Sequence, residues 1–181
     1  MSDVDRLDWL TRNWSRVRPD MDITPWQVWG RITRIHELFL AAITPALKKH
    51  GLTFKEFQTL AALVLVGPPY QANPNEITKF NLLTSGGTTN LLSRMEKEGL
   101  VRRKPDPADK RGVIVQITDK GLHSFSASVV EENRIEHDLL STLSPEERRV
   151  LAILLRKLLL SIDPVPASRN TDRQAGGGPS S

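Results

Sequence analysis

Two neighbouring stretches of the chain carry side chains that could contact a nucleic acid. The run 85–90 reads Ser-Gly-Gly-Thr-Thr-Asn and contains only short polar side chains or none at all. Such residues let a backbone approach base edges closely, and Thr and Asn side chains can hydrogen-bond to those edges. Between residues 102 and 111, five basic side chains stand against two acidic ones. This local excess of positive charge suits phosphate oxygens.

The residues before the first stretch predict a short helix over 74–80. Asn73 can cap this helix, Pro74 suits its first position, and Glu76 can reach back to the cap. A turn at 81–84 follows. This arrangement places the run 85–90 at the start of the next element.

Ser85 or Thr84 can cap a second predicted helix, which runs to about Glu98 and ends at Gly99. Its apolar residues are expected to face the core. They are Leu91, Leu92 and Met95. The first turn is then left exposed, and its backbone N–H groups favour a nearby phosphate oxygen.

A hairpin with a charged tip is predicted after the second helix. Val101, Val113, Val115 and Ile117 alternate or nearly alternate with polar residues, as half-buried strands do, and 105–111 forms the loop. We expect DNA contacts from both the helix and the hairpin. The residues are Ser85, Gly86, Thr88, Thr89, Asn90, Arg94, Lys104, Lys110 and Arg111.

Each of these signals is weak by itself. Polar helix starts occur on many helices that bind nothing, and a basic loop is usually a solvated surface. The order helix, turn, polar-tipped helix and basic hairpin within about 45 residues is much more specific. It predicts a winged helix-turn-helix.

The run from Ser85 to Gly121 resembles the winged helix of the multiple antibiotic resistance regulator (MarR) family. The wing signature of that family, an Asp two residues before an Arg, falls on Asp109 and Arg111, and its motif after the wing appears as 117–121, Ile-Thr-Asp-Lys-Gly. The resemblance covers about residues 27–162. It implies a dimeric DNA-binding regulator, most often a repressor that a small aromatic or phenolic ligand releases. Asp109 would structure the wing and Arg111 would enter a minor groove.

The composition is consistent with that class. The chain has 181 residues, a formal net charge of +4, a pI near 9.6 and no cysteine. The absence of cysteine excludes disulfides, thiolate catalysis and Cys-based zinc or redox sensing. No signal peptide and no membrane span are visible, which favours the cytoplasm. We expect no metal and no cofactor.

Most of the chain is predicted to be helical, so the expected fold class is mainly α with a small β-hairpin wing. The predicted parts are an extension helix within 1–25, a helical dimerisation region from 26–52 and 119–163, the winged helix at 53–118, and a disordered tail at 164–181. Thr53 and Ser144 are predicted helix caps. His36 lies on an apolar helix face and is interpreted as an interior residue.

The last predicted helix is apolar on nearly all sides between residues 150 and 162. A helix of this kind must be buried on more than one side. A homodimer explains this and would present two reading helices to successive major grooves of a pseudo-palindromic operator. A self-contained helical core is the alternative.

The extension resembles that of a urate-responsive MarR subgroup, whose extra helix carries a Trp at the ligand pocket. Trp14 matches that position and Arg103 matches a pocket arginine, but Gln58 and Leu91 stand where the subgroup has Asp and Arg. A less polar aromatic acid or a phenol is therefore the expected ligand. Alternatively, Trp14 belongs to the core or dimer interface, and Arg103 contacts phosphate.

Two functional classes follow from these features. The first is a ligand-responsive transcription regulator, and the second is a constitutive or architectural DNA-binding protein with no ligand. An enzyme is not indicated, because neither a Gly-rich phosphate loop nor a nucleophile with its base can be placed in the sequence.

Overall fold

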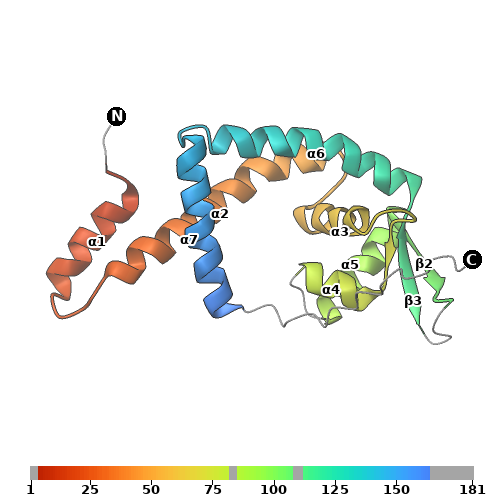
Figure 1. The fold of residues 1–181 in the computed structure, drawn as a ribbon, viewed down its shortest axis with the longest axis horizontal. Helices are drawn as coiled ribbons and strands as arrows, with labels where there is room; N and C mark the ends of the chain where they lie inside the picture. Colours follow the sequence, from red (N-terminus) through yellow and green to blue (C-terminus); the bar gives the residue numbers. More distant parts are fainter. Residues whose placement is uncertain (1–3, 82–84, 108–111, 164–181) are drawn as a thin grey trace, which may run out of the picture. The chain divides into compact units, whose positions relative to one another are not determined.

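The computed structural model describes residues 4–81, 85–107 and 112–163, and it confirms a mainly helical fold with a small sheet (Figure 1). The chain divides into two compact units, residues 1–139 and 140–181. The helices are α1 Arg6–Val17, α2 Thr24–Lys49, α3 Phe54–Leu65, α4 Pro74–Asn81, α5 Ser85–Lys97, α6 Asp119–Leu139 and α7 Pro145–Ile162, and the strands are β1 Gln71–Ala72, β2 Val101–Pro105 and β3 Val113–Ile117.

The predicted helix caps are present. The backbone N–H of Asn73 donates to Glu76 Oε2 at 2.9 Å, and the N–H of Glu76 donates back to Asn73 Oδ1 at 3.0 Å. Thr53 and Ser144 form the same reciprocal box at the starts of α3 and α7. These local bonds satisfy N–H groups that a helix start otherwise leaves unpaired.

The sheet has one strand more than the predicted hairpin. β2 and β3 pair antiparallel from Val101↔Ile117 to Pro105↔Val113, and β1 adds two residues to the other edge of β3, through Ala72↔Val115. The sequence pattern missed β1 because two residues are too few to show an alternation.

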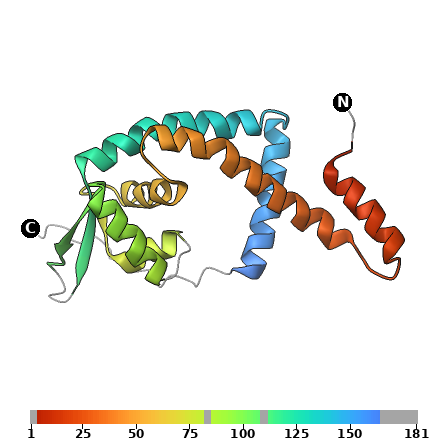
Figure 2. The same cartoon turned by 180° about the vertical axis from the view of Figure 1, so that it is seen from behind.

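Helix α1 is fixed along the N-terminal half of α2 (Figures 1 and 2). Arg31 of α2 forms ion pairs with Asp5 at 2.8 Å and Asp8 at 2.6 Å. Leu7 lies directly over Gly30, where an added Cβ would come within 2.5 Å of a Leu7 methyl carbon. The indole rings of Trp14 and Trp26 meet edge to face, 5.1 Å apart. Charged, small and aromatic contacts therefore hold the extension on α2.

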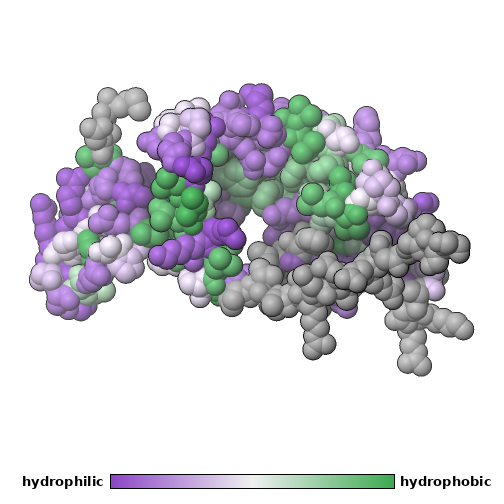
Figure 3. Space-filling model, in the orientation of Figure 1, coloured by the Kyte–Doolittle hydropathy of each residue, from purple (hydrophilic) through white to green (hydrophobic). Residues whose placement is uncertain are grey.

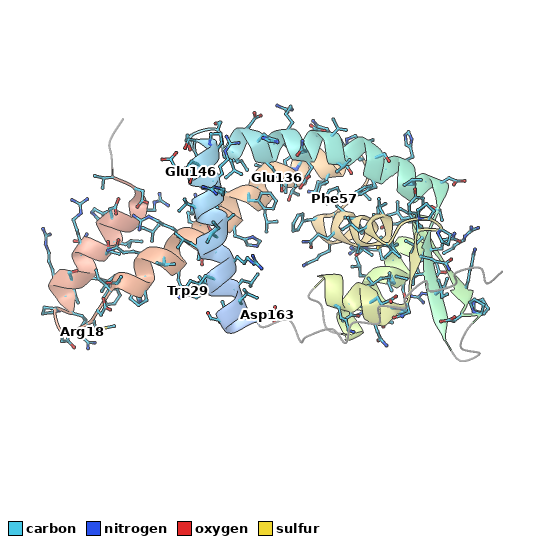
Figure 4. All side chains as sticks on the ribbon, in the orientation of Figure 1. Arg18, Trp29, Phe57, Glu136, Glu146 and Asp163 are labelled. Atoms are coloured by element: carbon cyan, nitrogen blue, oxygen red, sulfur yellow. The ribbon has the colours of Figure 1, made fainter. Side chains whose placement is uncertain are left out.

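One hydrophobic core gathers α3, α4, α5 and the sheet, together with Ile43 and Leu47 of α2. Its fully buried side chains include Leu60, Leu63, Ile77, Leu92, Met95 and Val115. The Phe57 ring of α3 stacks on Phe125 of α6 with centroids 5.4 Å apart, which joins this core to the long helices (Figure 4).

Helix α7 has no buried residue within the described chain. Most of its large apolar side chains are 40–59% exposed, and they include Leu151, Ile153, Leu154, Leu159 and Ile162. Figure 3 shows hydrophobic surface over this helix. Among the described residues, no helix has the length and apolar character that crossing a bilayer requires.

Candidate nucleic-acid interface

Packing of α5 decides which of its residues are exposed. Leu91, Leu92 and Met95 are buried in the core, as predicted. Gly86, Thr89 and Asn90 lie on the exposed side of the helix. The start of α5 therefore presents a small polar surface, and Ser85 begins the helix that carries it.

Thr88 does not belong to that surface. Its side chain is 1% exposed, and its hydroxyl accepts a hydrogen bond from the Thr78 hydroxyl of α4 at 2.9 Å. This burial argues against the DNA contact predicted for Thr88. The residue instead joins the two helices of the helix-turn-helix.

Arg94, another predicted DNA contact, is half exposed but bonds to two residues of its own chain. Its Nε donates to Glu56 Oε1 at 2.7 Å, and its Nη2 donates to Thr53 Oγ1 at 3.4 Å. The Glu56 side chain is 2% exposed. Sequence reasoning missed Glu56 as the partner of Arg94, although it predicted Thr53 as the cap of this helix.

The Glu56 carboxylate remains charged despite its burial. Burial is the largest influence and raises its pKa, but hydrogen bonds from Thr53 and the guanidinium of Arg94 outweigh it. The net pKa therefore lies below the ordinary value for Glu. Thr53 and Arg94 therefore act together to keep this buried carboxylate charged at neutral pH.

The base of the wing is closed by backbone pairing. The N–H of Asp106 donates to the Gly112 carbonyl at 3.0 Å, directly beyond the last pair of β2 and β3. Lys104 is half-buried on β2. Asp109, Lys110 and Arg111 lie outside the described residues.

Arg103 ties the wing to the reading helix. Its Nη2 donates to Ser93 Oγ at 2.9 Å, its Nε lies 3.6 Å from Glu96 Oε2, and its backbone N–H donates to Glu96 Oε1 at 3.0 Å. These contacts fix β2 against α5. The Glu96 and Ser93 partners were not recognised in the sequence.

The junction from α5 to α6 is also tightly built. Gly99 has a φ of +72°, which permits the turn that ends α5. The Thr118 hydroxyl donates to the Gly99 carbonyl at 2.6 Å and accepts from the Gly121 N–H at 3.1 Å. A Cβ at Gly121 would lie 2.1 Å from the Leu100 carbonyl oxygen, so only glycine fits there.

The four predicted ligand residues do not meet within one chain. Trp14 lies on α1, while Gln58 and Leu91 lie in the winged helix and Arg103 lies on β2, at the far end of α2 from α1 (Figure 1). Leu91 is 7% exposed and belongs to the core. Gln58 Oε1 is buried and has no hydrogen-bond partner among the described residues.

Two surface hollows were found elsewhere in the described chain. One of about 240 Å³ is lined by Pro69, Tyr70, Arg102, Gln116, Ile117, Thr118, Asp119 and Leu122. The other, of about 560 Å³, lies against α1 and is lined by Val4, Asp5, Arg6, Trp9, Leu10 and Arg12. Neither is lined by any of the four predicted ligand residues.

Comparison with known proteins shows which family shares this architecture. Residues 50–112 match the model of the MarR family. The chain is 34% identical over 149 residues to the transcriptional regulator PecS of Dickeya dadantii, which covers 82% of this chain and 90% of that protein.

Solved structures agree with the sequence comparison. A mutant MarR of E. coli complexed with operator DNA has a TM-score of 0.67 at 25% identity, over 76% of this chain and 95% of that chain. BpsR of Bordetella bronchiseptica, whose DNA binding is regulated by 6-hydroxynicotinic acid, has a TM-score of 0.65 at 25% identity, over 73% and 98%. The chain belongs to the MarR family of DNA-binding transcription regulators, whose members are dimers and are not enzymes.

Proposed function

We propose that the first turn of α5 reads base edges in a major groove while the wing contacts the adjacent minor groove. The observation that carries this proposal is the orientation of α5, which buries its apolar side and exposes Gly86, Thr89 and Asn90. Short polar side chains at a helix start can approach bases closely and hydrogen-bond to them. Phosphate contacts from the wing would fix the register.

The proposed DNA contacts exclude Thr88 and Arg94, because the first is buried and the second is paired with Glu56. The remaining set combines the helix start with the wing. It consists of Ser85, Gly86, Thr89, Asn90, Lys104, Lys110 and Arg111, with Asp109 structuring the wing.

We further propose that residues 26–52 and 119–163 form the dimerisation region. The apolar side chains exposed on α7, including Leu154 and Leu159, need a covering surface, which a second subunit supplies. A twofold dimer would carry two copies of α5 to the half-sites of a pseudo-palindromic operator, about 34 Å apart. The protein would act in the cytoplasm.

The small molecule that we propose as inducer is an aromatic acid or a phenol. The buried, unpaired Oε1 of Gln58 supports this, because such an acceptor favours a donor such as a phenol hydroxyl or a protonated acid. The regulation of BpsR by 6-hydroxynicotinic acid concerns the same class of compound. Trp14, Leu91 and Arg103 are the other proposed pocket residues, and Trp14 would have to come from a different subunit from the rest.

The test is fluorescence anisotropy on the DNA upstream of the protein's own gene and on a scrambled duplex, across a salt series. A preference of about a hundredfold or more, with one dimer per site, is the expected result for a specific regulator. Equal, salt-sensitive binding to both duplexes would instead mean that the specific target lies elsewhere or that the protein is architectural. A titration with aromatic acids and phenols then tests release, and complete insensitivity would favour the constitutive alternative.

A further inference from the structure

We propose that Glu56 and Arg94 act as a positioning pair that holds the reading helix α5 in the orientation required for sequence-specific binding. The proposal rests on the DNA-binding function proposed above. It gives Arg94 an indirect part in recognition, in place of the direct DNA contact that its position on α5 had predicted.

The pair links two elements that must keep a fixed geometry. Glu56 lies in the first turn of α3, and Arg94 lies in the last turn of α5. The 2.7 Å contact between Arg94 Nε and Glu56 Oε1 spans 38 residues of sequence, and the 3.4 Å bond from Nη2 to Thr53 Oγ1 reaches the cap of α3. One guanidinium therefore bonds to both the cap and the first turn of α3.

Burial makes the link strong. The Glu56 side chain is 2% exposed, and the Thr53 N–H and hydroxyl bind its second oxygen at 2.7 and 2.8 Å. Removal of Arg94 would leave a buried charge without its cation, which is costly. Neutralising Glu56 would leave an amide group facing donors, because Thr53 and Arg94 both donate to this site.

Arg94 is differently placed from an arginine that binds phosphate. Half of its side chain is exposed, but Nε, which can take part in bidentate recognition, is already bonded to Glu56. A phosphate contact and a positioning role predict different effects of substituting Glu56. Only the positioning role makes Glu56, a buried residue, matter as much as Arg94.

The experiment compares Glu56→Gln, Arg94→Met and the double variant with the wild type. The probes are a duplex selected by the wild type from a random library and a scrambled duplex of equal length. Arg18→Met is the matched control, because Arg18 forms an exposed 2.7 Å ion pair with Asp20 at the end of α1 and is itself about half exposed (Figure 4). Hydrogen exchange of the DNA-free proteins supplies a second readout.

The expected result is a loss of about tenfold or more on the selected duplex for both single variants, with binding to the scrambled duplex changed by less than about twofold. On the selected duplex, the double variant should bind as tightly as the single variant with the lower affinity, because the two residues act as one unit. Amides of α5 should exchange faster in both variants while those of α1 and α2 keep their rates, and Arg18→Met should match the wild type.

A different pattern would overturn the pair. If Arg94→Met weakened both duplexes equally and made the salt slope shallower by about one, with Glu56→Gln unchanged, Arg94 would be a phosphate contact. If the wild type selected no duplex, the proposed function would fail. The exchange measurement would still decide the pair, because unchanged α5 exchange in Glu56→Gln and Arg94→Met would refute it.

Discussion

The winged helix and helix α7 use their apolar residues in opposite ways. Leu92 and Met95 of α5 are at most 1% exposed within a single chain, whereas Leu154 and Leu159 of α7 are 59% and 57% exposed. The first region buries its hydrophobic surface against its own chain, whereas the second leaves it exposed, and we propose that a partner subunit covers it. The stability of the winged helix and the stability of the dimer should therefore be separate properties, and a substitution in one region should leave the other unchanged.

Leu92→Ala should have the largest effect and should act on the winged helix alone. Truncating a fully buried leucine costs about 2–5 kcal/mol, because it loses contacts and leaves a cavity. Chemical denaturation at several protein concentrations measures this. We expect a lower midpoint with the concentration dependence of the wild type; an altered concentration dependence would contradict the separation of the two regions.

Leu154→Glu should weaken the dimer and leave the fold of the winged helix unchanged. A carboxylate on the exposed apolar side of α7 would have to be buried in the dimer, at a cost of about 2–4 kcal/mol. Sedimentation velocity should show a shift towards monomer, and specific DNA affinity should fall with it. Leu154→Met is the matched control, and a variant that stays dimeric would show that α7 is not covered by the partner at this point.

Asn90→Ala should affect DNA recognition without affecting the stability of the fold. The residue is exposed, so its loss should leave the denaturation midpoint unchanged while discrimination at one or two base pairs falls by about 1–2 kcal/mol. Anisotropy with duplexes altered at single positions measures this. Equal losses on specific and random duplexes would remove the base-reading role of Asn90.

Trp14→Ala tests the ligand proposal at the other end of the chain. We expect the affinity for DNA to be nearly intact, whereas about tenfold more aromatic acid or phenol should be needed for release. Trp9→Ala is the control, because Trp9 is the more exposed of the two indoles at 61%. An unchanged ligand titration in Trp14→Ala would remove this residue from the pocket.

Glu132→Gln should give the smallest effect. Burial, followed by the hydrogen bond and the charge of Glu136, raises the pKa of Glu132 from 4.5 to about 7. The folded state therefore holds this proton more tightly than the unfolded state, so the wild type should lose stability as the pH rises from about 4.5 to 7. Gln cannot ionise, and thermal unfolding should show a gain on the order of 1 kcal/mol at pH 8 with none at pH 4. Equal shifts at both pH values would contradict this origin.

Local signals made much of this fold predictable. Asn73 and Glu76 cap α4 through bonds within one turn, and Gly99 ends α5 through its own backbone conformation, so neighbouring residues carry that information. The exposed start of α5 followed from the positions of Leu91, Leu92 and Met95 on the same helix.

Contacts between elements that are distant in the sequence could not be predicted from it. Thr88 and Arg94 lie on a helix with a correctly predicted exposed side, but their roles depend on Thr78 and Glu56, 10 and 38 residues away. The spacing of apolar residues identifies the buried face of a helix, but it does not identify the residues of other elements that contact the borders of that face. Arg103 is similar, because its bonds to Ser93 and Glu96 depend on how β2 turns back along α5.

The contact between Trp14 and Trp26 gives the molecule an optical property. Two indole rings with centroids 5.1 Å apart and planes inclined at 66° are close enough for their electronic transitions to couple, so circular dichroism carries a signal from their mutual orientation. The signal depends on two residues that lie on α1 and α2 and on no added label. A change in the angle between these helices should therefore alter the circular dichroism of the unmodified protein.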